Sequence, residues 1–233
     1  MEMQKSRLAP FGGIIFDLDG TLLDSIEDIA MASNKVLINN GLPGHSLDKY
    51  VEFIGNGARR IIQRALPEHL KLDDVVVEKI LDEYKTAYKE NIVVKSCLFE
   101  GISELLLHLN NRKIPIAINT NKPHDQTMLI AQKLLNDFIF AVLVGQRDEN
   151  QKKPDPFGAL YIANHLGLKP EEILFVGDSA VDVKTAQNAG MQMVGVSWGY
   201  SKENELENAG CETIVDSVSE LRILIDNCIY TKK

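Results

Sequence analysis

Short apolar runs alternate along this chain with longer stretches in which apolar residues recur every three or four positions. The runs are rich in β-branched residues and end at turn residues, which is typical of strands buried on both faces of a parallel sheet. The longer stretches have the period of amphipathic helices. Strands are predicted at residues 11–16, 114–118, 138–144, 173–176 and 193–196, with a weaker one at 213–215. Because strands that alternate with helices are joined by right-handed crossovers, we expect an α/β fold with a doubly wound parallel sheet.

The stretch between the first two predicted strands has a different pattern, with helical periods and no convincing strand. Three apolar helical faces occur there: Ile26, Ile29, Ala30 and Leu37; Ile61, Ile62, Ala65 and Leu66; and Val77, Ile80, Leu81, Tyr84 and Tyr88. The stretch is too long for one crossover. We therefore expect an inserted helical cap domain at residues 24–98 and a core formed by residues 1–23 and 99–233. A unit tethered at both ends beside the first strand is placed to act as a lid.

The composition is that of a soluble globular protein and limits the possible partners. Of the 233 residues, 45% are hydrophobic and 25% are charged, and the formal net charge is -8. This charge argues against nucleic acid or an anionic membrane as the main partner. A small anionic substrate is compatible with it, because a metal ion and a lysine can reverse the field locally.

The N-terminus and the cysteines indicate a cytoplasmic protein. The first residues lead into a short apolar run that is broken by Asp17, so neither a signal peptide nor a membrane span is predicted. Cys97, Cys211 and Cys228 have no metal-ligand spacing. We expect them to be reduced thiols, with Cys97 packed in the interior.

An acidic motif, Asp17-Leu18-Asp19-Gly20-Thr21, follows the first predicted strand. Open parallel sheets bind their ligands beyond the carboxyl ends of the strands. Side chains two residues apart in an extended chain point the same way, so both carboxylates can face one ligand. The motif alone is also compatible with an ordinary acidic turn, since Asp and Gly are common turn residues.

Three further segments carry polar side chains next to predicted strands or prolines. Thr120-Asn121-Lys122-Pro123 follows a strand, and its hydroxyl and backbone N–H groups can bind a phosphoryl oxygen. Lys153 precedes Pro154, which fixes the local chain, and its ammonium can offset phosphate charge. Val176-Gly177-Asp178-Ser179 follows another strand, with a further carboxylate at Asp182. Each segment alone is equally typical of a solvated loop or turn.

Together the motifs bring four carboxylates to one edge of the predicted sheet. Without compensation these charges would repel one another by several kcal/mol. The cluster therefore predicts a bound cation, and oxygen ligands with open water positions select Mg²⁺.

With these motifs in this order, the chain resembles the haloacid dehalogenase superfamily of phosphotransferases, and within it the phosphoglycolate phosphatase branch. The resemblance covers nearly the whole chain. Its motifs are Phe16 to Ser25, Gly55-Asn56-Gly57-Ala58, Thr120 to Pro123, Lys153-Pro154-Asp155-Pro156 and Val176 to Ser179. It implies a hydrolase for a small phosphorylated metabolite.

The resemblance also implies roles for individual residues. Asp17 would be the nucleophile that forms an aspartyl phosphate. Asp19 would be the general acid that protonates the leaving group and then the base that activates water. Thr120 would donate a hydrogen bond to the phosphoryl group, and Lys153 would neutralise charge on Asp17 and on the transferring group.

A metal site is implied at the same place. The Asp17 carboxylate, the Asp19 backbone carbonyl and the Asp178 carboxylate would hold Mg²⁺. Asp182 would order Lys153 or a metal-bound water rather than touch the metal, and Ser179 would support it.

Substrate specificity would lie where the helical insertion meets the core. Asn56 and Gly57 form the expected contact loop, Asn121 is expected to contact the substrate, and Arg64 could pair with a carboxylate such as that of glycolate. A solvated helix residue is the other interpretation of Arg64. The hinge at Ser96 to Gly101 lacks the Pro-Gly pair often seen in this family.

Other functions on the same scaffold stay open at this point. A sugar-phosphate mutase, a pyrophosphatase and a nucleotidase would use the same core motifs, although Thr21 and the loop around Gly57 favour the phosphatase. A phospho-receiver signalling domain also places an aspartate, a threonine and a lysine around Mg²⁺. In a receiver the phosphorylated aspartate follows an earlier acidic pair, whereas Asp17 ends the first strand here.

Overall fold

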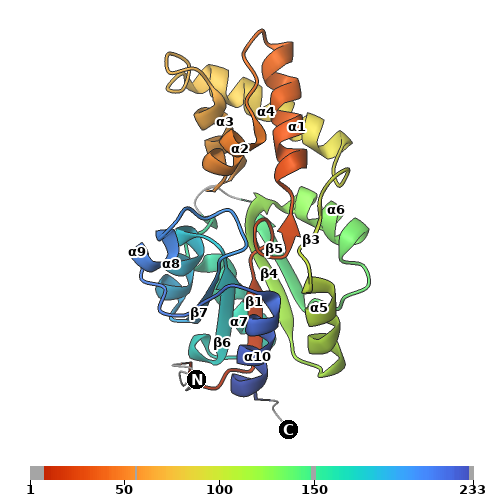
Figure 1. The fold of residues 1–233 in the computed structure, drawn as a ribbon, viewed down its shortest axis with the longest axis vertical. Coiled ribbons are helices and arrows are strands. Elements are labelled where there is room, and N and C mark those ends of the chain that lie inside the picture. The colour runs from red at the N-terminus through yellow and green to blue at the C-terminus, as the bar shows by residue number, and fades with distance from the viewer. Residues whose placement is uncertain (1–7, 56, 148–150, 231–233) are drawn as a thin grey trace.

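The computed structural model describes residues 8–55, 57–147 and 151–230. At its centre is a six-stranded parallel sheet with the strand order β5-β4-β1-β6-β7-β8 (Figure 1). The strands are β1 Gly13–Phe16, β4 Ile116–Pro123, β5 Val142–Gln146, β6 Ile173–Gly177, β7 Gln192–Val196 and β8 Ile214–Val215. The predicted α/β fold with a doubly wound parallel sheet is confirmed.

Helices cover both faces of this sheet. They are α5 Ile102–Asn111, α6 His124–Leu134, α7 Phe157–Leu166, α8 Ala180–Ala189, α9 Glu205–Asn208 and α10 Val218–Cys228, with a 3-10 turn η2 Pro170–Glu172. Alternate residues of β1 enter two hydrophobic cores. Ile14 and Phe16 pack in a core with α5 and α10, whereas Ile15 packs in a core with α7 and α8. All three side chains are fully buried, which explains why this strand is apolar throughout.

Two strands differ from the predicted ranges for local reasons. The strand predicted at 114–118 begins two residues later, because Lys113 in the left-handed region (φ 58°) and the bond from Ile114 N–H to the Leu109 carbonyl end α5 first. It also continues to Pro123, so the Thr120 motif is part of β4. The strand predicted at 138–144 begins at Val142, because Ile139 N–H is bound by the Asn110 side chain.

The helical insertion lies beyond the carboxyl end of the sheet (Figure 1). It contains α1 Ile26–Asn39, α2 Leu47–Phe53, α3 Ala58–Ala65 and α4 Asp74–Glu90. The predicted apolar face of α4 is buried throughout, with Val77, Tyr84 and Tyr88 each at most 3% exposed. None of the described helices is long and apolar enough to cross a membrane.

A two-stranded antiparallel ladder connects the insertion to the sheet. Its strands are β2 Leu23–Asp24 and β3 Cys97–Leu98, which the hydrophobic pattern did not predict because two residues carry no period. The expected boundaries at 23/24 and 98/99 fall within this ladder. Cys97 is exposed here, so its predicted burial is wrong; Cys211 is the buried cysteine.

Asp28 joins the first helix of the insertion to the chain that returns to the core, on the insertion side of the ladder. Its carboxylate is 3% exposed and accepts hydrogen bonds from the N–H groups of Val94, Lys95 and Ser96 at 2.9–3.0 Å, and from the Ser96 hydroxyl at 2.6 Å. The first helix of the insertion and the returning chain are therefore held as one piece. Any motion of the insertion relative to the sheet would therefore have to occur at β2 and β3.

Candidate active site

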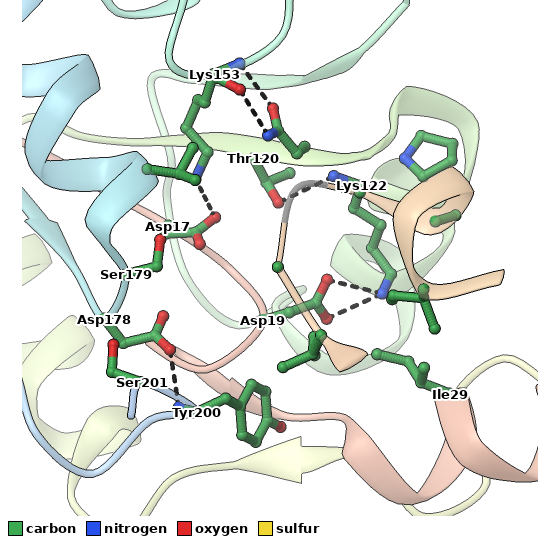
Figure 2. Close-up of a pocket in the computed structure, with 18 of the residues that line it drawn as sticks. Asp17, Asp19, Ile29, Thr120, Lys122, Lys153, Asp178, Ser179, Tyr200 and Ser201 are labelled. Carbon is green, nitrogen blue, oxygen red and sulfur yellow. Dashed lines mark hydrogen bonds and ion pairs between the residues drawn. The ribbon is translucent and has the colours of Figure 1, made fainter. Parts of the chain in front are cut away.

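The predicted catalytic residues line one cavity at the carboxyl ends of β1, β4 and β6 (Figure 2). Its volume is about 110 Å³. At roughly 10–15 Å³ for each water position, it has room for several waters, which is the scale of a small molecule. The core contributes Asp17, Asp19, Thr120, Lys153 and Asp178, and the helical insertion contributes Ile29, Gly57 and Tyr84 among others.

Lys153 lies between two carboxylates on one side of the cavity. Its Nζ is 2.7 Å from Asp17 Oδ1 and 2.6 Å from Asp182 Oδ1, and the side chain is 4% exposed. Burial alone would lower the pKa of Lys153, but the carboxylates of Asp17 and Asp182 raise it above its usual range. The ammonium therefore stays charged where a phosphoryl group would develop negative charge.

Asn121 holds Lys153 in place through the backbone. Its side-chain amide donates to the Lys153 carbonyl at 2.9 Å and accepts from the Lys153 N–H at 2.7 Å. Asn121 does line the cavity, but its amide is already used twice in this way. The geometry therefore makes Asn121 a support for Lys153, and its predicted contact with substrate stays a prediction.

Asp17 and Asp178 face the cavity with carboxyl groups of raised pKa. Burial raises the pKa of Asp17 to about 7, since its effect together with the charge of Asp182 outweighs the opposing effect of Lys153. Burial also raises the pKa of Asp178 well above its ordinary value, and the carboxylates of Asp182 and Asp17 add to this. Two neighbouring carboxyl groups with raised pKa indicate a site where a bound cation would stabilise the ionised forms.

The carboxylates of Asp17, Asp178 and Asp182 lie close enough to share one metal ion, with one oxygen of each within 4.8 Å of the others. Asp182 is already occupied, because Lys153 holds one of its oxygens and the Ser179 N–H and hydroxyl hold the other. Asp17 and Asp178 have more freedom to bind an ion. The predicted role of Asp178 as a ligand, with Asp182 and Ser179 as supporting residues, stays a prediction.

Two glycines keep space open around Asp178. A Cβ atom built on Gly20 would lie 2.3 Å from the Asp178 carboxylate, and one on Gly199 would lie 2.4 Å from its Cβ. The Thr21 hydroxyl (3.0 Å) and the Tyr200 N–H (2.9 Å) donate to the carboxylate and orient it. This buried, oxygen-only donor set fits a hard divalent cation such as Mg²⁺.

Asp19 is held apart from the other acids. Lys122 Nζ is 2.9 Å from both Asp19 carboxylate oxygens, and the Ser25 hydroxyl donates to Oδ1 at 2.6 Å. Figure 2 shows Asp19 turned toward Lys122, while Asp17 points to Lys153. Asp19 therefore has its own lysine partner, separate from the Lys153 that pairs with Asp17.

Lys122 is a site residue that the sequence did not assign, although it stands within the Thr120 motif. It is 7% exposed, and its ammonium lies 4.7 Å from the centre of the Tyr88 ring on α4. Burial opposes its charge, but Asp19, Tyr88 and Tyr84 together outweigh burial and raise the pKa of Lys122. One ammonium thus links the core acid Asp19 to the helical insertion.

Thr120 and Gly57 lie where β4 meets the start of α3. Thr120 is 4% exposed, lines the cavity, and accepts a hydrogen bond from Lys122 N–H at 3.2 Å. Gly57 has φ +84°, and a Cβ built there would lie 3.5 Å from the Asn121 carbonyl oxygen. The described part of this loop therefore touches the core, and its contact with substrate stays a prediction; Asn56 lies outside the described residues.

Arg64 has a different place from the one expected. Its guanidinium donates to the carbonyls of Phe53 (2.7 Å) and Ile54 (2.9 Å), and so closes the C-terminus of α2. It lines a separate surface recess on the helical insertion and not the cavity that contains Asp17. The sequence left the role of Arg64 open, because the hydrophobic period of a helix does not show whether an arginine caps a neighbouring helix or binds a ligand.

Comparison with known proteins agrees with this geometry. The family model for haloacid dehalogenase-like hydrolases matches residues 14–196. The phosphoglycolate phosphatase of Pseudomonas putida is 34% identical over 92% of this chain and 79% of its own length. That of Nitrosococcus oceani is 30% identical over 91% of this chain and 95% of its own.

Solved structures show the same relationship. A protein from Haemophilus somnus, described as a predicted phosphoglycolate phosphatase, superposes with a TM-score of 0.83 and 32% identity over 91% of this chain and 97% of that chain. A haloacid dehalogenase-like hydrolase from Bacteroides fragilis has a TM-score of 0.80 and 27% identity, over 91% and 99% of the two chains. The chain therefore belongs to the haloacid dehalogenase-like hydrolases and is a phosphatase of that family.

Proposed function

We propose that this phosphatase hydrolyses 2-phosphoglycolate to glycolate and phosphate, with Mg²⁺ as cofactor and an aspartyl phosphate on Asp17 as intermediate. One observation carries the mechanism: the Asp17 carboxylate lies at the floor of a small cavity, paired with Lys153 and adjacent to Asp178. The substrate assignment is supported by the relatives that are named phosphoglycolate phosphatases.

In the first step the Asp17 carboxylate attacks phosphorus, and the bond from phosphorus to the leaving-group oxygen breaks. Asp19 gives its proton to that oxygen, so that glycolate leaves as the alcohol. Lys153 and the Thr120 hydroxyl offset charge on the phosphoryl oxygens. Asp19 must turn away from Lys122 to do this, because Lys122 bonds both of its carboxylate oxygens in this structure.

In the second step water attacks the phosphorus of the aspartyl phosphate. Asp19, now a carboxylate, takes the proton from this water, and the bond from phosphorus to Asp17 breaks. Inorganic phosphate leaves, and both aspartates return to their starting state. Lys153 acts in both steps because it is anchored by Asp182 and by Asn121.

Asp17 and Asp178 would hold Mg²⁺, with the Asp19 backbone carbonyl as the third protein ligand. Bound there, the ion supplies positive charge to the transferring phosphoryl group. Asp182 and Ser179 keep Lys153 in place beside it.

Residues 24–98 would act as a cap domain on the core formed by residues 1–23 and 99–233. The cavity lies between the two, since Gly57 and Tyr84 of the insertion line it together with Asp17 and Asp178. Closure would exclude water from the first step, and opening at the β2–β3 ladder would release products.

The test is release of inorganic phosphate from a panel of phosphoesters, with Mg²⁺ and with EDTA. The panel includes 2-phosphoglycolate, pyrophosphate, glucose 1-phosphate and nucleoside monophosphates. We expect Mg²⁺-dependent turnover with a clear preference for 2-phosphoglycolate. A preference for another phosphoester would overturn the substrate, and phosphoryl transfer to a second sugar hydroxyl without phosphate release would identify a mutase.

A further inference from the structure

Two buried polar side chains in the cavity have no partner among the described residues. Gln126, in the first turn of α6, and Tyr84, in the middle of α4, are each 3% exposed, and both line the cavity. Within the described part of the chain, no hydrogen bond engages the Gln126 amide or the Tyr84 hydroxyl. One of these groups comes from the core and the other from the helical insertion.

Neither group is among the fully buried polar atoms without a partner in the described residues, so both open onto the cavity, and most polar groups in protein interiors are hydrogen-bonded. Two of them facing one small cavity therefore indicate a ligand that bonds to both. The mechanism proposed above uses neither, because its reacting groups are Asp17, Asp19, Thr120 and Lys153.

A cation lies at the same end of the cavity. Lys122 precedes Gln126 by four residues where β4 runs into α6. The Lys122 ammonium also interacts electrostatically with the Tyr84 hydroxyl. Lys153, the other lysine lining the cavity, is already placed between Asp17 and Asp182. The second lysine, Lys122, pairs with Asp19 in this structure and becomes available to a ligand when Asp19 turns toward the leaving group, as the proposed mechanism requires.

The helical insertion contributes apolar side chains to the wall of the cavity. Ile29, Ile54 and Ile61 line it from this side. A volume of about 110 Å³ has room for several water positions, which suits a small leaving group. The matching leaving group is therefore short and carries one anionic group.

We propose that Lys122, Gln126 and Tyr84 form a subsite that binds the carboxylate of the leaving group and selects short, carboxylate-bearing phosphoesters. One ammonium and two neutral donors match the oxygens of a carboxylate. The subsite rests on the proposed function, since it assumes that the phosphoryl group occupies the Lys153 end. It assigns specificity to Gln126 and Tyr84, which do not touch the reacting atoms.

The test compares two substrates that differ only at this group: 2-phosphoglycolate and 2-hydroxyethyl phosphate, in which a neutral CH₂OH replaces the carboxylate. Gln126→Leu and Tyr84→Phe keep the size of each side chain and remove the donor. Each is expected to lower kcat/KM for 2-phosphoglycolate by about 10- to 100-fold, as for hydrogen bonds to charged groups. The value for 2-hydroxyethyl phosphate should change by less than about threefold.

Matched controls are available on surfaces away from the cavity. Gln132→Leu, on the same helix as Gln126, and Tyr161→Phe on α7 alter exposed residues and should leave both substrates unaffected. Lys122→Met should weaken turnover of both substrates, because Lys122 also pairs with Asp19, but it should weaken that of 2-phosphoglycolate more.

The ratio of the two kcat/KM values separates the possible outcomes. If the wild type prefers 2-phosphoglycolate and the ratio is unchanged in Gln126→Leu and Tyr84→Phe, the subsite is wrong and the proposed function stands. If the wild type releases phosphate from other esters but not from 2-phosphoglycolate, the proposed substrate is wrong and the subsite falls with it. A selective loss in both variants supports both proposals.

Discussion

At the scale of single residues, the site pairs each of two acids with its own lysine. Lys153 pairs with Asp17, the proposed nucleophile, and Lys122 pairs with Asp19, the proposed acid and base. Because the two pairs are separate, Asp19 can leave Lys122 in the proposed mechanism while the pair between Lys153 and Asp17 stays in place.

Asp17→Asn is expected to abolish turnover without disturbing the fold. The amide cannot attack phosphorus, and loss of a nucleophile in comparable enzymes costs about 10⁴-fold or more. Phosphate release measures the effect, with circular dichroism to confirm that helix content is unchanged. Asp137→Asn, an exposed position on the core, is the matched control. Turnover by Asp17→Asn near the wild-type rate would show that another group is the nucleophile.

Lys153→Met is expected to lower both activity and stability, for separable reasons. Loss of a charge that stabilises the transition state costs about 10²–10³ in kcat. Asp182, which is fully buried, is then left without its ionic partner, at about 3–5 kcal/mol. Adding Asp182→Asn removes that charge and retains an oxygen for Ser179, so the double variant should regain melting temperature but not kcat. Recovery of kcat as well would show that Lys153 acts only through folding.

At the scale of elements, Tyr200 joins the Asp178 side of the core to the first helix of the insertion. Its N–H donates to Asp178, while its hydroxyl accepts from the N–H groups of Ser25 (2.7 Å) and Ile26 (3.2 Å) and donates to Asp24 (2.8 Å). The Ser25 hydroxyl makes no cap at the start of α1, because it is bonded to Asp19. Tyr200 supplies that cap from the other side of the hinge.

Tyr200→Phe should therefore loosen the start of α1 and leave metal binding intact. Loss of a cap costs about 1 kcal/mol, or roughly fivefold in a local opening equilibrium. Hydrogen exchange over residues 25–29 should quicken by about this factor, and kcat/KM should fall to a similar extent. The Mg²⁺ concentration for half activation should not change, because the backbone bond to Asp178 remains. An altered Mg²⁺ requirement with unchanged exchange would contradict this role for the hydroxyl.

The elements also show what could be predicted from the sequence and what could not. Asp17, Asp178 and Lys153 were recognisable because each stands beside an apolar strand or a proline with its own sequence signature. Lys122 was not, because its partner Asp19 lies 103 residues away and only the fold brings them together. Tyr200 likewise reaches Ser25 across 175 residues. Tyr84 was predicted on the buried face of its helix, but nothing in that period shows that its hydroxyl faces a cavity.

At the scale of the whole molecule, the active-site acids link stability to pH. The folded-state pKa of Asp17 is about 7, against an ordinary value of 3.8, and that of Asp178 is also raised. At pH values between the two pKa values of Asp17, its carboxyl group is protonated in the folded protein and ionised in the unfolded chain. The free energy of unfolding of the metal-free protein therefore falls as the pH rises. For Asp17 alone the loss is on the order of 4 kcal/mol, at about 1.36 kcal/mol per pKa unit.

Bound Mg²⁺ should remove this penalty, because it favours the ionised form of both carboxylates and binds only the folded state. The rise in melting temperature on adding Mg²⁺ should therefore be larger at pH 8 than at pH 5. In EDTA, Asp17→Asn should become more stable than the wild type across the same range, because its amide does not ionise. Calorimetry of both proteins, with and without the ion, measures this. Equal Mg²⁺ effects at the two pH values, with Asp17→Asn following the wild type, would show that Asp17 is ionised in the metal-free fold and that Lys153 alone balances its charge.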